Sequence, residues 1–139
     1  MAAKIVIDTS VFISALISSI RASRELLRQC LLLKYQPLMG NALFCEYEQV
    51  INRDEVLRSC LSTEEIQTLL ASFMSVCEWT RIYYLWRPNL KDEADNHLIE
   101  LAIAGNAKII ATNNIKDFKQ TQLIFPELLI RKPGEIINL

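Results

Sequence analysis

The sequence predicts an α/β protein in which a parallel β-sheet is covered by helices on both faces. Short apolar segments typical of strands alternate with longer segments of helical spacing, and this alternation is typical of parallel sheets. Only three glycines and four prolines occur in 139 residues, which favours a compact, helix-rich chain. The length is typical of one domain, spanning residues 1–139, that can bury a core of its own.

The clearest strand signal is "KIVID", where three apolar β-branched residues precede Asp8. Pro37 weakens a second strand in "YQPLMG", whereas "EWTRIYYLW" is rich in aromatic and β-branched residues. The expected strands are residues 5–8, 35–40, 78–86 and 108–112, with a short last strand in the tail 122–139.

Helix starts are marked by residues whose side chains cap amino-terminal ends. Thr9 or Ser10 can cap a first helix, and Ser62 forms a capping box with Glu65 three residues later. Gly105 is expected to end the last long helix. The expected helices are 10–18, 24–33 (capped by Ser23), 41–57 (capped by Asn41), 62–77 and 91–105, followed by a turn or half-helix at 114–118.

Composition and charge exclude several classes of protein. A net charge of −1 argues against a nucleic-acid binder that acts through bulk charge, although it allows a local basic rim. One histidine, and cysteines without a C-x-x-C pair, argue against a zinc site. We expect buried free thiols at Cys30, Cys45, Cys60 and Cys77. No apolar run reaches about 18 residues, and no signal peptide precedes the first strand, so we expect a soluble cytoplasmic protein.

Two acids occupy positions where a carboxylate is unusual. Asp8 ends a buried strand, where it faces either a crevice at the sheet edge or a simple capping turn. Glu46 shares a helix side with Leu43 and Val50, which is uncommon for a carboxylate unless it is paired or binds a metal. A solvated helix face remains the alternative, and Glu48 competes for the same role.

Two further regions place acids near the same edge. Asp92 and Asp95 share a face at a helix start, where the helix dipole alone also favours acids. The strand "KIIAT" ends in Thr112 and is followed by two asparagines, of which we expect Asn113 to be a turn residue. For Asn114 and Asp117 the sequence allows two roles, as part of a functional site or as turn residues.

Convergence of these acids would require a cation. Crowded carboxylates raise one another's pKa, and a hard divalent ion removes that cost. Oxygen ligands without clustered histidine or cysteine suit Mg²⁺ or Mn²⁺. Such ions activate water and stabilise a phosphodiester under attack, so the pattern favours phosphodiester hydrolysis.

Three stretches resemble the PIN-domain ribonucleases, in particular the VapC-like toxins of toxin–antitoxin pairs: "IVIDTSVFISAL", "ALFCEYEQVI" and "KDEADNHLIELAIAGNAKIIATNNIKDF". The likeness spans nearly the whole chain, and the last stretch is the most specific. The resemblance implies a three-layer α/β/α sandwich and a Mg²⁺- or Mn²⁺-dependent endoribonuclease that hydrolyses single-stranded or loop RNA. It also implies an antitoxin partner and self-association into a dimer or larger oligomer.

The resemblance carries roles to particular positions. Asp8, Glu46 and Asp95 match metal-binding acids and, together with Asp117, are the expected catalytic residues. Residues expected to support these ligands or to position water are Ser10, Asp92, Thr112 and Asn114. Asn114 stands where the family often has an acid, and an amide cannot neutralise a cation's charge. This departure favours the alternative function, a catalytically weakened PIN-fold module that binds RNA or a partner protein.

RNA contacts are expected from Arg87, Lys91 and Lys116, which flank the acids. Tyr84 and Trp86 could stack on bases, but a core strand or an oligomer contact is the preferred interpretation. Two other α/β classes rank lower. A phosphoacceptor receiver domain usually has two adjacent acids after its first strand, and no G-x-G-x-x-G follows the strand as in a dinucleotide-binding domain.

Overall fold

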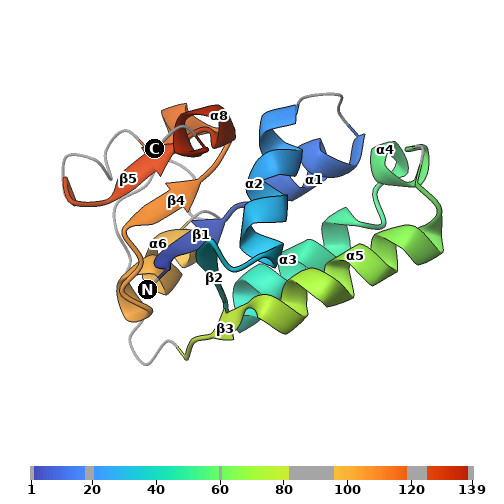
Figure 1. Ribbon diagram of the computed structural model, residues 1–139. Coiled ribbons are helices and arrows are strands. Elements are labelled where there is room, and N and C mark those ends of the chain that lie inside the picture. Colours follow the sequence, from blue (N-terminus) through green and yellow to red (C-terminus); the bar gives the residue numbers. More distant parts are fainter. Residues whose placement is uncertain (1, 18–20, 60, 82–95, 119–124, 138–139) are drawn as a thin grey trace.

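The computed structural model describes residues 2–17, 21–59, 61–81, 96–118 and 125–137, and within them five parallel strands form a sheet (Figure 1). The strand order is β3-β2-β1-β4-β5, which places β1 at the centre. Ile5 of β1 pairs with Pro37 on one side and with Ile109 on the other. The strands are β1 (Ala3–Ile7), β2 (Tyr35–Met39), β3 (Glu78–Trp79), β4 (Ile109–Ala111) and β5 (Leu129–Arg131).

Helices lie on both sides of the sheet, which confirms the predicted α/β/α sandwich (Figure 1). Helix α6 contacts β1, β2 and β4, whereas α2 and α5 contact β2. The helical elements are α1 (Thr9–Ile17), α2 (Arg21–Leu31), α3 (Asn41–Val50), α4 (Asp54–Leu57), α5 (Thr63–Val76), α6 (Asn96–Ala104), the 3₁₀ helix η2 (Ile115–Phe118) and α8 (Pro133–Ile136).

The core explains why β1 consists of consecutive apolar residues. A central parallel strand is covered on both faces, so Ile5, Val6 and Ile7 are all buried. Beside this strand the rings of Phe12 and Tyr47 pack edge to face with their centroids 5.1 Å apart. The buried Tyr47 hydroxyl donates to the Ile7 carbonyl at 2.8 Å, which fixes α3 against the end of β1.

The helix expected at 41–57 is two helices, because the chain turns after Val50. The Asn52 side chain donates to the Glu48 carbonyl at 3.0 Å and so satisfies a group that the ended helix leaves free. The Asn41 cap was also wrong, since Gly40 is the cap residue and has no side-chain bond. Ser23 does not cap α2 either, because the helix begins at Arg21 and Ser23 is buried in its first turn.

Gly105 follows α6 as expected, but for a different physical reason. The left-handed residue at this helix end is Asn106, with φ 58°, and no described glycine has a positive φ. A Cβ at position 105 would instead collide with Cδ1 of Leu38 and lie 3.3 Å from the Leu101 carbonyl oxygen. Gly105 therefore permits close packing of α6 against β2.

The remaining predictions have mixed outcomes. The capping box of Ser62 and Glu65 is present, and the tail contains β5. The expectation of buried thiols holds for Cys30, holds only in part for Cys77, which is half-buried, and is wrong for Cys45, which is exposed.

The third expected strand is shorter than predicted, since β3 ends at Trp79 and neither Thr80 nor Arg81 is in a strand. Positions 82–86 of that strand, positions 91–95 of the last long helix, and Cys60 lie outside the described residues. No helix within the described ranges has the length and apolar character needed to cross a bilayer.

Candidate functional site

Polar side chains gather where β1 and β4 end, because neighbouring parallel strands bring their carboxyl ends to one edge of the sheet. Helix α3, which follows β2, completes a pocket of about 330 Å³ there. This acidic pocket is lined by Asp8, Thr9, Ser10, Ile13, Ser14, Glu46, Arg53, Asn113 and Asn114.

Asp8 is buried at the base of the acidic pocket, with only 4% of its surface exposed. Two hydroxyls donate to its Oδ2 atom, Ser10 Oγ at 2.9 Å and Thr112 Oγ1 at 2.7 Å. Its backbone N–H donates to the Ala111 carbonyl at 2.9 Å. The carboxylate is therefore fixed in direction by neutral donors, which leave its negative charge available to a cation.

Glu46 is held through both of its oxygens. Thr9 Oγ1 donates to Oε1 at 2.6 Å, and His97 Nε2 lies 2.8 Å from Oε2. Because an ionised carboxylate only accepts hydrogen bonds, Nε2 is the donor. The side chain thus has one partner from α1 and one from α6.

The pKa of Glu46 is lowered, chiefly by the hydrogen bond from His97, with burial opposing and Thr9 and Arg53 assisting. Crowded acids were expected to raise one another's pKa, and for Glu46 that expectation was wrong. The physical reason is that its nearest partners are a histidine and a hydroxyl. Glu46 is therefore ionised at neutral pH, as a metal ligand must be.

The two asparagines after β4 form different hydrogen bonds, Asn113 with α1 and Asn114 with Thr112. Asn113 Nδ2 donates to the Ser10 carbonyl at 3.1 Å and to Ser14 Oγ at 2.8 Å, so Asn113 is more than the predicted turn residue. The Asn114 N–H donates to Thr112 Oγ1 at 3.0 Å. Thr112 thus accepts from one side and donates to Asp8 on the other, while the exposed Asn114 side chain reaches the pocket wall.

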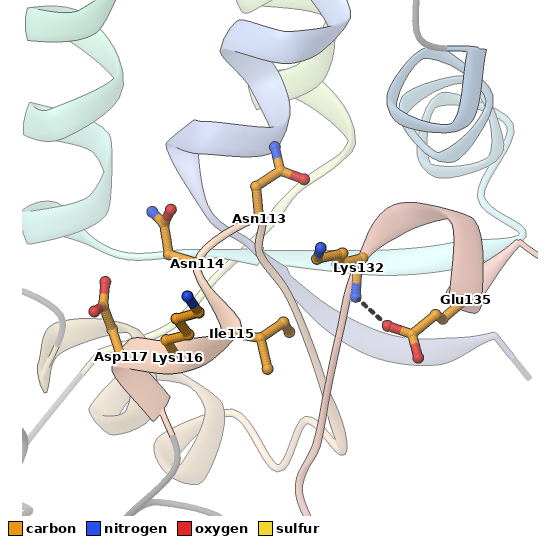
Figure 2. A pocket seen from close by; sticks show the side chains of 7 residues that line it. All are labelled: Asn113, Asn114, Ile115, Lys116, Asp117, Lys132 and Glu135. Atoms are coloured by element: carbon orange, nitrogen blue, oxygen red, sulfur yellow. Dashed lines mark hydrogen bonds between the residues drawn. The ribbon is translucent and has the colours of Figure 1, made fainter.

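Asp117 and Lys116 lie beside the acidic pocket rather than in it. They belong to a neighbouring pocket of about 540 Å³, here called the lysine pocket (Figure 2). It is lined by Asn113, Asn114, Ile115, Lys116, Asp117, Lys132 and Glu135. The structure therefore brings Asp8, Ser10, Glu46, Thr112 and Asn114 together and puts Asp117 on the far side of the asparagines. The other predicted residues, Asp92, Asp95, Arg87, Lys91, Tyr84 and Trp86, lie outside the described ranges.

Sequence reasoning missed the roles of His97, Arg53 and the Thr9 side chain. His97 is the chain's lone histidine and meets a partner 51 positions away, so no local pattern marks it. Arg53 follows a helix break that the helical spacing did not predict. Thr9 was expected only as a cap.

The donor atoms fit a hard divalent cation. Carboxylate oxygens of Asp8 and Glu46 and the Asn114 amide line one pocket, and oxygen donors of this kind suit Mg²⁺ or Mn²⁺. Three acids, histidines or cysteines placed to hold a metal do not occur together among the described residues. Asp95, the expected third carboxylate, lies outside those residues.

Comparisons with known proteins agree with this architecture. None of the curated proteins matches the chain. The fold is similar to a chain in the crystal structure of VapBC2 from Rickettsia felis bound to a DNA fragment from their promoter, with a TM-score of 0.63. Sequence identity is 18%, and the match covers 93% of this chain and 98% of that chain, so the likeness concerns the fold alone. A family model described as the PIN domain matches residues 4–116, and the chain therefore belongs to the PIN-domain family.

Proposed function

We propose that the protein is a metal-dependent endoribonuclease that hydrolyses RNA phosphodiester bonds. The observation that carries this proposal is the meeting of Asp8 and Glu46 in one pocket at the carboxyl edge of the sheet. Each carboxylate accepts from hydroxyl or histidine donors that fix its direction. Membership of the PIN-domain family supports the assignment.

Asp8, Glu46 and Asp95 would hold Mg²⁺ or Mn²⁺, with the Asn114 amide oxygen as a neutral donor. A bound ion of this kind supplies positive charge to the phosphodiester oxygens and lowers the pKa of water. Ser10 and Thr112 keep the Asp8 carboxylate aimed at the pocket.

Thr9 and His97 hold the Glu46 carboxylate in place through hydrogen bonds. Its lowered pKa suits a metal ligand better than a proton donor. Arg53 adds a cation to the pocket wall that can face a phosphate. We propose that Arg87, Lys91 and Lys116 contact RNA, that Asp92 supports the ligands, and that Asp117 assists from beyond Asn114.

Calorimetry and RNA cleavage test the proposal together. Mn²⁺ should bind the parent protein and bind Asp8→Asn much more weakly, because a neutral amide holds a hard cation less well than a carboxylate. Asp95→Asn should weaken Mn²⁺ binding in the same way. Equal Mn²⁺ affinity in the parent and Asp8→Asn would remove Asp8 from the site.

The RNA cleavage assay compares substitutions at different places around the acidic pocket. With Mg²⁺ or Mn²⁺ and a mixed-sequence RNA, Asp8→Asn should abolish cleavage and Asp117→Asn should only reduce it. Asn114→Asp should tighten metal binding by adding a negative ligand. An unchanged rate in Asp117→Asn would leave Asp117 with only a turn-capping role.

Asn114 also favours a second candidate function, in which the domain binds RNA or a partner protein with little catalysis. A neutral amide at this position lowers the negative charge that attracts the cation. RNA binding without cleavage by the parent protein at any Mn²⁺ concentration would support this candidate over the ribonuclease.

We propose further that the protein is the toxin of a type II toxin–antitoxin pair, acts in the cytoplasm and self-associates. The structural likeness to a chain of the VapBC2 complex supports an antitoxin partner. A small gene for a DNA-binding protein immediately upstream, whose product co-purifies with this chain, is the expected finding. Light scattering of the purified chain tests self-association, for which a monomer is the contrary result.

A further inference from the structure

The lysine pocket is a second concave surface beside the acidic pocket, and the proposed function gives no role to Lys132, which lines it. It forms because β4 and β5 are parallel neighbours, so that the residues following both strands meet at the sheet edge. Asn113 to Asp117 follow β4, and Lys132 follows β5 directly. Figure 2 shows Lys116 and Lys132 on opposite sides of Ile115, below Asn113.

The two lysines keep their charges available within the described part of the chain. Both side chains are exposed, and neither ammonium group has an ion-pair partner there. Glu135 lines the same pocket, but its Oε1 accepts the Lys132 backbone N–H at 3.1 Å and not the ammonium group (Figure 2). Asp117 remains as a negative group on the same wall. A ligand of this pocket therefore has anionic groups spaced to meet two separate ammonium groups.

Strand order places this pocket in line with the acidic pocket. Along the carboxyl edge of the sheet, the spatial order of these residues is Glu46 after β2, Asp8 after β1, Asn114 after β4 and Lys132 after β5. Asn113 and Asn114 line both pockets and form the ridge between them. The ends of β1 and β5 are about 10 Å apart, twice the spacing of neighbouring strands. One extended polymer can therefore occupy both pockets.

We propose that the lysine pocket binds the phosphate backbone of single-stranded RNA beside the cleaved bond, with Lys116 and Lys132 on separate phosphates. This inference rests on the proposed ribonuclease function, and it adds the direction in which the strand runs, from β1 toward β5. The exposed Asn114 side chain, at the ridge, is placed to meet the nucleotide between the two pockets.

The chain supplies a matched control for the two lysines. Lys34 and Lys108 are also exposed, but they immediately precede β2 and β4 and so lie at the opposite edge of the sheet. The pair Lys116→Gln/Lys132→Gln and the pair Lys34→Gln/Lys108→Gln change the net charge equally. Thermal unfolding of both double variants checks that each is folded.

Binding is measured without cleavage, by fluorescence anisotropy of a short labelled single-stranded RNA in EDTA over a series of salt concentrations. Log affinity falls as log salt concentration rises, and each lost phosphate contact should make this slope about 0.7 less steep. The slope of Lys116→Gln/Lys132→Gln should therefore be about 1.4 less steep than that of the parent. The control pair should keep the parent slope. Single-stranded DNA of the same sequence, run in parallel, shows which backbone the lysines hold.

Equal slopes in the pocket and control pairs overturn the inference, as does a parent protein that binds DNA alone or no nucleic acid. The inference is also overturned if the Lys116→Gln/Lys132→Gln variant keeps the parent's salt dependence of RNA binding but no longer co-purifies with an antitoxin. That result would assign the lysine pocket to the antitoxin. Cleavage is scored separately. If the parent does not cut RNA but the salt slope is still less steep in Lys116→Gln/Lys132→Gln, the nuclease function is refuted and the lysine subsite is supported.

Discussion

At the scale of single residues, Glu46 shows how a partly buried hydrogen-bond network sets the charge of a side chain. Its two oxygens are bonded to Thr9 and His97, which lie on different helices. The side chain of Glu46 is only 30% exposed, so these bonds compete with little water. The ionised form of Glu46 is thus maintained without a cation.

Replacement of His97 tests this account. In EDTA, His97→Leu should raise the pKa of Glu46, because it removes the largest influence that lowers it. His97→Gln keeps a donor and should give a smaller rise. A carboxyl NMR titration measures both, and an unchanged pKa in His97→Leu would contradict the assignment.

The same shift has a consequence for stability against pH. A carboxyl whose pKa is lowered by folding stabilises the folded state above its unfolded pKa, and this contribution is lost as the pH falls through the folded value. Between neutral pH and a pH below 4.5, the ordinary pKa of Glu46, the parent should therefore lose more stability than His97→Leu. Urea unfolding at the two pH values gives the comparison.

Thr112 is the most constrained hydroxyl of the site, since it is fully buried and bonds both Asp8 and Asn114. Thr112→Val should lower the free energy of unfolding by about 1–3 kcal/mol, because a buried carboxylate oxygen loses a donor. Thr112→Ser keeps the hydroxyl and should cost less. Denaturant unfolding in EDTA measures both, and a larger loss in Thr112→Ser than in Thr112→Val would indicate that the methyl group, not the hydroxyl, stabilises the fold.

At the scale of elements, strands were predicted better than helix ends. Runs of apolar β-branched residues mark β1 and β4 because central parallel strands are buried on both faces. The helix break after Val50 was missed, since the apolar spacing continues through Ile51 and Val56, both buried. Gly105 was placed correctly but misinterpreted, because a contact with Leu38, 67 positions earlier in the chain, leaves no local signal.

Substitution of Gly105 tests the close packing of α6. Gly105→Ala should destabilise the protein by about 1–3 kcal/mol, because the added methyl group collides with the buried Leu38. Gly134→Ala is the control, since its Cβ would lie 3.8 Å from Ala22 Cβ, an ordinary contact. This change in α8 should be neutral or stabilising by up to about 1 kcal/mol. Chemical unfolding curves that rank the two variants equally would contradict the argument.

At the scale of the whole molecule, the sequence predicted which strand ends form the site but not how its residues are paired. Asp8, Glu46 and Thr112 could be placed at one edge of the sheet because strand ends and apolar helix faces are visible in sequence. Sequence spacing does not reveal the hydrogen bonds of His97 and Asn113, or the lysine pocket, because these form between residues that are distant in the chain.

Metal binding should couple the site to the stability of the entire fold. Mn²⁺ at about one hundred times its dissociation constant should raise the free energy of unfolding by about 2.7 kcal/mol. Asp8→Asn should lose most of this gain, whereas Glu48→Gln, on the exposed side of α3, should retain it. Differential scanning calorimetry with Mn²⁺ and with EDTA measures the effect, and an equal gain in Asp8→Asn would argue against a site at the carboxyl edge.

The hydrogen bond from Thr112 to Asp8 also has a consequence for synthesis of the chain. It joins residues 104 positions apart, so a ribosome adds Thr112 104 residues after Asp8. Until the residues after β4 leave the exit tunnel, Asp8 lacks Thr112, one of the two hydroxyls that donate to its Oδ2 atom. For the ribonuclease proposed above, the acidic pocket would therefore form only after β4 has left the ribosome.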